Sequence, residues 1–86
     1  MILSSLALDL RRVAQGYFRG SVLMADRFLE EALRRKMEAE LLDEKPYIKK
    51  FLKRVELLKS ELDNQKKAED ALMMSTIFQN SVISNP

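Results

Sequence analysis

Apolar side chains recur at alternating intervals of three and four residues along almost the whole chain. The cleanest run is Ile48, Phe51, Val55, Leu58 and Leu62. This spacing places all five side chains on one face of a helix. About half of the 86 residues are Ala, Glu, Lys, Leu or Arg, the composition typical of coiled coils and long helices. We therefore expect an all-α protein, and a single domain spanning residues 1–86.

The N-terminal part carries a second apolar face, which changes direction partway along. Its first segment comprises Leu3, Leu6, Leu10, Val13 and Tyr17. The face resumes one residue out of step as Phe18, Val22, Ala25, Leu29 and Ala32. A slip of one residue rotates the buried face of a helix by about 100°. The two segments therefore pack against different parts of the fold.

The only two glycines of the chain, Gly16 and Gly20, lie where this change occurs. Either they allow a kink in a continuous helix, or Gly16 ends a first helix and Ser21 caps a second. Because no proline and no Asn or Asp cluster supports a loop there, we predict one long bent helix over residues 5–41. A weaker interpretation makes the four-residue glycine spacing a dimerisation face of the membrane type.

The remainder of the chain divides at two further points. "DEKPY" predicts a turn, because the residue before a proline avoids helical geometry and Pro46 suits the first position of a helix. Beyond Leu62 the apolar face points the opposite way, so the chain either breaks near Asp63–Asn64 or enters a different interface. The predicted elements are a turn at 42–45, a helix at 46–62, a helical segment at 64–80 and a frayed tail at 81–86.

Apolar positions in these elements exceed what one antiparallel helical hairpin can cover. Leaving a Leu, Ile or Phe side chain exposed forgoes about 1.5–3 kcal/mol of burial free energy. A monomeric three-helix bundle and a dimeric helical bundle both solve this problem. We expect the homodimer, because an N-terminal helix of about 60 Å is too long for two shorter helices to cover. The expected dimer interface comprises Gly16, Gly20, Met74 and Phe78.

Residues that carry enzymatic chemistry are scarce in this sequence. Histidine and cysteine are both absent, so the commonest general base, the strongest nucleophile and the usual zinc ligands are missing. Glu40 and Asp43 have the three-residue spacing that lets two carboxylates share a magnesium ion. A solvated acidic turn explains the same residues more simply. We expect a protein that is not an enzyme and has no cofactor and no metal.

Basic residues flank the predicted turn on both sides and provide an alternative function, association with nucleic acid. In an antiparallel hairpin the two groups merge into one patch that touches several phosphates. Acidic residues lie among them, so an ion-paired solvent face is the simpler interpretation. The residues of this predicted patch are Arg34, Arg35, Lys45, Lys49, Lys50, Lys53 and Arg54.

The favoured functional hypothesis is a small non-enzymatic module for protein–protein interaction that acts as a homo-oligomer. Tyr and Arg are enriched at interface hot spots, so Tyr17, Arg19 and Tyr47 are the candidate partner-binding residues. The longest uncharged stretch is too short and too polar to span a bilayer, and no basic segment precedes an apolar leader. The expected location is cytoplasmic.

Overall fold

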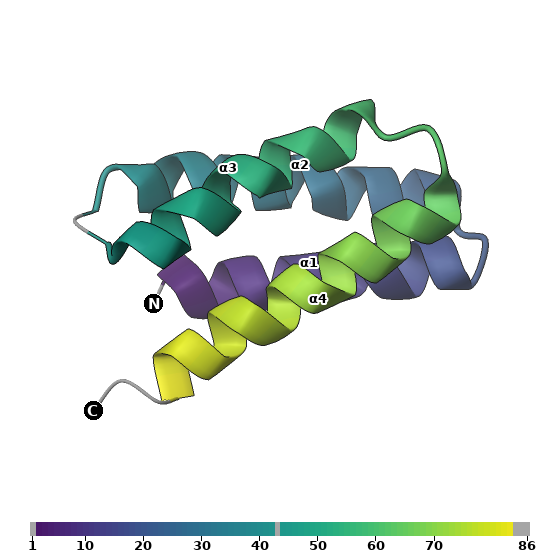
Figure 1. Ribbon diagram of the computed structural model, residues 1–86. Helices are drawn as coiled ribbons and strands as arrows, with labels where there is room; N and C mark the ends of the chain where they lie inside the picture. The colour runs from purple at the N-terminus through teal and green to yellow at the C-terminus, as the bar shows by residue number, and fades with distance from the viewer. Residues whose placement is uncertain (1, 43, 84–86) are drawn as a thin grey trace.

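Four helices make up the part of the chain that the computed structural model describes, residues 2–42 and 44–83, and this part contains no strand. The helices are α1 (Ile2–Phe18), α2 (Val22–Glu40), α3 (Pro46–Ser60) and α4 (Asn64–Ile83). Each helix runs antiparallel to the one before it (Figure 1). Because α1 and α3 each contact both α2 and α4, the helices close a ring around one core. The predicted all-α class is confirmed.

The prediction of one continuous N-terminal helix is wrong, because the chain reverses between Phe18 and Val22. Gly20 has a φ of 78°, a left-handed conformation that side chains with a Cβ adopt at a cost. The Gly20 N–H donates to the Tyr17 carbonyl (3.1 Å), and the Ser21 N–H donates to the Gly16 carbonyl (2.8 Å). These two bonds form a Schellman motif that ends α1. The shift in the apolar face therefore marks the passage from one helix to the next.

The other glycine lets α1 and α2 approach each other closely. A Cβ atom on Gly16 would lie 2.8 Å from the Ala25 Cβ and 3.0 Å from the Ala25 Cα. Gly16 thus contacts Ala25 of the same chain, and the prediction that it lies in a dimer interface is wrong. A Cβ atom on Gly20 would have no neighbouring atom within 4 Å, so within one chain this glycine is needed for the turn and not for packing.

The remaining helix boundaries follow from local capping. Pro46 opens α3 after an extended Lys45 with φ −62° and ψ 150°. The Asp63 carboxylate accepts hydrogen bonds from the backbone N–H groups of Gln65 (3.0 Å) and Lys66 (3.4 Å), which caps α4. Several predicted bounds differ from the structure. The helix predicted over residues 46–62 ends at Ser60. The first helix already begins at Ile2, and the last continues to Ile83, so residues 81–83 are helical; residues 84–86 lie outside the described part.

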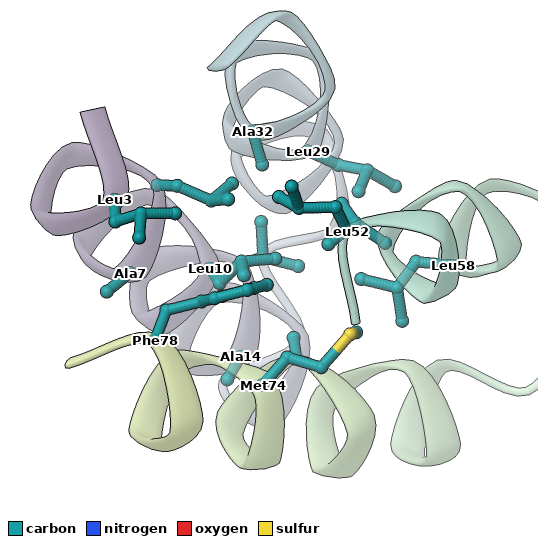
Figure 2. Packing of buried hydrophobic residues seen from close by; sticks show 14 of the residues in the cluster. Leu3, Ala7, Leu10, Ala14, Leu29, Ala32, Leu52, Leu58, Met74 and Phe78 are labelled. Carbon is teal, nitrogen blue, oxygen red and sulfur yellow. The ribbon is translucent and has the colours of Figure 1, made fainter. Parts of the chain in front are cut away.

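Side chains from all four helices fill the core. Met74 and Phe78 point from α4 into the space between the helices, Phe78 toward Leu10 of α1 and Met74 toward Leu58 of α3 (Figure 2). Both are almost completely buried within the single chain, so their predicted place in a dimer interface is corrected as well. The opposite apolar faces before and after Leu62 need no second chain, because α3 and α4 are separate helices that face the same core.

Small residues set the close packing of α1 against α4. Ala7 and Ala14 of α1 and Ala71 of α4 are buried, which lets the helix backbones approach. The buried Ser75 hydroxyl of α4 donates a hydrogen bond of 2.8 Å to the Ala7 carbonyl. This bond joins segments 68 residues apart in the sequence, and it fixes the register of the two helices.

Candidate functional site

A polar cluster ties three helices together at the end of the bundle that holds the α1–α2 turn. The Tyr17 hydroxyl of α1 donates a hydrogen bond to the Asp26 carboxylate of α2. The Lys67 ammonium of α4 lies 3.5 Å from the same hydroxyl and 5.2 Å from the centre of the tyrosine ring. Tyr17 is only 6% exposed. It therefore stabilises the fold and does not present its ring to a partner.

The three candidate partner-binding residues do not meet. Arg19 is exposed in the α1–α2 turn, and Tyr47 is exposed in the first turn of α3. Because successive helices alternate in direction, the α1–α2 turn and the start of α3 lie at opposite ends of the bundle (Figure 1). Tyr17, Arg19 and Tyr47 consequently form no common surface.

Stability above pH 10 tests the polar cluster. Burial and the hydrogen bond to Asp26 raise the pKa of Tyr17 above its ordinary value of 10.0. The folded state thus retains the phenol proton at a pH where the unfolded state loses it, so its contribution to stability falls as pH rises above 10. We expect the free energy of unfolding of the native chain to exceed that of Tyr17→Phe by about 1 kcal/mol at pH 8. This difference is expected to disappear by about pH 11. Urea unfolding at both pH values measures it, and an unchanged advantage would refute the assignment.

A second cross-helix pair links α1 to α2 near the middle of the bundle. The Arg35 Nε lies 3.7 Å from the Asp9 Oδ2, and within the described part neither of these two buried atoms has a hydrogen-bond partner. Burial raises the pKa of Asp9, and the neighbouring guanidinium groups of Arg35 and Arg12 offset this only partly. Arg35 also lies 3.9 Å from Glu38. Arg35 is therefore a structural residue more than a part of a basic patch.

Lys36 is a buried cation that joins α2 to α3. Its ammonium lies 3.1 Å from a Glu40 carboxylate oxygen and 3.3 Å from a Glu56 carboxylate oxygen. Burial lowers the pKa of Lys36, but the hydrogen bonds to Glu40 and Glu56 outweigh burial and leave the pKa above its ordinary value. Glu56 is the only acidic residue of α3. Its pairing with Lys36 leaves the outer face of that helix basic.

The predicted basic patch divides into two groups with different partners. Arg34 pairs with Glu31 at 3.1 Å, and Arg35 pairs with Asp9 and Glu38. In contrast, no described carboxylate forms an ion pair with Lys50, Lys53 or Arg54 of α3. These three exposed side chains, together with the exposed Lys45 and Lys49, form the basic face of α3. The guanidinium carbon of Arg54 lies 5.5 Å from the centre of the Phe51 ring, over its face.

The outward face of α2 carries large apolar side chains that the core does not use. Leu23, Met37 and Leu41 are 83%, 65% and 87% exposed. They share one line along the helix and its C-cap with charged residues, and we call this line the outer stripe. Its residues are Leu23, Arg27, Glu30, Arg34, Met37 and Leu41. The sequence contains this three-four spacing. Because half of the residues in it are charged, the sequence alone did not identify it as an apolar face.

Hollows on the surface of the described residues are lined by both polar and apolar groups. One of about 230 Å³ lies between α1 and α4, beside Leu8, Arg11 and Gln79. Another of about 330 Å³ lies beside Asp26, Lys59 and others from α2, α3 and α4. Neither brings together a nucleophile, a base and an orienting group. The residues that line these two hollows therefore point to no particular reaction.

Acidic side chains in the described residues form no group of three or more that could hold a metal ion. Glu40, one half of the pair considered for magnesium, binds Lys36 instead. Asp43, the other half, lies outside the described residues. None of the four helices is long and apolar enough to cross a bilayer, within residues 2–42 and 44–83.

Comparisons of the chain with protein-family models, with curated proteins and with solved structures produced no match.

Proposed function

We propose that this protein is a small non-enzymatic module that acts by binding other proteins. The observation that supports the proposal is the combination of a core closed by one chain with an outer stripe that leaves large apolar side chains in water. Leu23 and Leu41 are the most exposed large apolar residues of the stripe. Neither contributes to the core, so folding alone gives no reason for an apolar residue at these positions.

The energetics favour a partner for this surface. Covering an exposed Leu or Met side chain contributes about 1.5–3 kcal/mol when burial is complete. Arg27 and Arg34 lie between the apolar residues of the stripe, and arginine is enriched in protein interfaces. Apolar anchors among arginines are typical of a contact surface with a protein, and they provide no catalytic group.

Photo-crosslinking from the outer stripe tests the proposal. We expect a photoreactive amino acid at position 23 or 37 to give discrete adducts with protein in cells that produce the chain. The same amino acid at Gln79, an exposed residue of α4, is the matched control and is expected to give none. Equal labelling from all three positions, or no adduct from the stripe, would contradict the proposal.

A second candidate function is binding to a polyanion such as nucleic acid, and the basic face of α3 favours it. This helix contains four lysines and one arginine against the single Glu56, a net charge of +4 within a chain of net +2. Three of these cations, Lys50, Lys53 and Arg54, form no ion pair with a described carboxylate. A helix face of this charge attracts phosphates independently of sequence.

Charge reversal separates this second function from the first. We expect Lys50→Glu/Lys53→Glu to weaken binding to a labelled nucleic-acid duplex and to reduce the slope of log affinity against log salt by about 2, one for each phosphate that the variant no longer binds. The control Arg11→Glu/Arg19→Glu changes the net charge equally on exposed residues of the α1 region. Fluorescence anisotropy at several salt concentrations measures both. Equal losses in the two variants would leave only a nonspecific charge effect and remove the second function.

A further inference from the structure

The outer stripe occupies a narrow arc on the far side of α2 from the core. Ala32, at the middle of the helix, is completely buried. At 100° per residue, the six residues of the stripe fall within about 40° of the direction opposite Ala32. The stripe therefore runs nearly parallel to the helix axis and presents a straight edge to solvent.

Residues of the stripe are arranged symmetrically about position 32. Leu23 lies nine residues before Ala32 and Leu41 nine after it. Arg27 and Met37 lie five residues before and after, and Glu30 and Arg34 two residues before and after. An antiparallel copy of the same helix, centred on Ala32, places each of these residues opposite its counterpart. This self-complementarity is the requirement of a two-fold interface.

Charges in this antiparallel register are complementary as well. Each Glu30 faces the Arg34 of the second copy, so the centre of the interface contains two equivalent ion pairs. Arg27 comes close to the second copy's Glu38, whose side chain is 44% exposed beside the stripe. Leucines close both ends, and the alkyl part of Arg27 covers Met37. Each charged residue of the stripe therefore has an opposite charge of the second copy across from it or beside it, which favours association and fixes the register.

We propose that two copies of this chain associate through their outer stripes, with the two α2 helices antiparallel about a two-fold axis beside Ala32. This inference rests on the proposed function and names its partner as a second copy of the chain. The homodimer expected from the sequence is thereby retained with a different interface, on the outside of a core that each chain completes alone. One helix pair gives a contact smaller than a standard interface, so the dimer is expected to dissociate on dilution.

Sedimentation equilibrium on the purified full chain tests the interface with a matched pair of variants. Leu41→Glu inserts a carboxylate into the stripe and is expected to weaken dimerisation at least tenfold. Leu62→Glu makes the same change at a residue that is 94% exposed between α3 and α4, away from the stripe, and is expected to leave dimerisation unchanged. A native chain that stays monomeric at all concentrations, or equal effects of the two variants, would overturn the proposal.

A charge exchange makes the test independent of folding defects. Glu30→Arg and Arg34→Glu each create like-charge pairs in their own homodimers, so each variant alone is expected to be monomeric. Mixed in equal amounts, they restore opposite charges at both central contacts and are expected to form a heterodimer. A mixture that remains monomeric would overturn the proposed register. Persistent photo-crosslinks to other proteins in that case would leave the proposed function standing, which separates the two failures.

Discussion

Replacement of Phe78 by alanine is expected to lower the free energy of unfolding by about 3–5 kcal/mol. Phe78 is completely buried, and its ring lies among side chains of the core (Figure 2). The substitution removes the apolar contacts of the ring and leaves a cavity that the surrounding helices fill only partly. Domains of this size have a total stability of only about 5–10 kcal/mol. The variant is therefore expected to be partly unfolded near body temperature.

Urea unfolding followed by circular dichroism measures this effect, and Phe18→Ala is its matched control. Phe18 is half-exposed at the end of α1, so the same change there is expected to alter stability by no more than about 0.5 kcal/mol. The loss at Phe78 is also expected to be independent of protein concentration, because the ring is buried within one chain. A loss that disappears when the protein is diluted would place Phe78 between subunits instead.

Replacement of Gly16 by valine is the second large effect, with an expected loss of about 3 kcal/mol. The first atom of any side chain at this position meets the backbone of α2, at 3.0 Å from the Ala25 Cα and 3.1 Å from the Ala25 N. Backbone cannot move aside as a flexible side chain does, so α1 and α2 must separate. The gain in helix propensity over glycine is less than about 1 kcal/mol and does not offset the loss.

Gly20→Ala provides the comparison for this prediction. Space at position 20 is open, and only the positive φ of 78° opposes a side chain. The expected cost is about 1–2 kcal/mol, less than at Gly16. Thermal unfolding of both variants measures the order. A larger loss at Gly20 than at Gly16 would show that the turn, and not the close approach of the helices, requires glycine here.

Local patterns in the sequence predicted the helical class, and Pro46 indicated where the second half of the fold begins. One decision, the continuation of a helix through Gly20, led to the wrong interior. A helix of about 60 Å has no partner of equal length in the chain, which made a second subunit necessary. Division at Gly20 yields helices of 17 and 19 residues, comparable with the 15 and 20 residues of α3 and α4. Four helices of similar length cover each other.

Helical periodicity identifies a face but does not identify what covers that face. Leu62 continues the apolar spacing of α3, but α3 ends before it, at Ser60. Lys36 is the converse of Leu62, since it is a charged residue that is buried on the inward face of α2. Its burial is possible because Glu40 and Glu56 neutralise its charge. Its pairing with Glu56 depends on the contact between α2 and α3, which no single-helix pattern contains.

The candidate functional surface was hidden for a related reason. Leu23 and Leu41 lie eighteen residues apart, and three of the four stripe residues between them are charged. Such a pattern is typical of an ordinary solvated face, and only the structure shows that no described helix covers Leu23 and Leu41. The sequence placed all the basic residues near the turn in one patch, but the ion pairs of Arg34 and Arg35 set these two residues apart from the basic face of α3. Those pairs depend on geometry that the spacing leaves open.

An engineered disulfide between α1 and α4 tests the central claim, a core closed by one chain, most directly. The native chain has no cysteine, and the Ser75 hydroxyl lies 2.8 Å from the Ala7 carbonyl oxygen. Oxidised Ala7→Cys/Ser75→Cys protein is expected to contain no free thiol, to keep the 10.0 kDa mass of a single chain and to gain about 4 kcal/mol of stability from the closed loop. Formation of disulfide-linked dimers in place of this monomer would contradict the account.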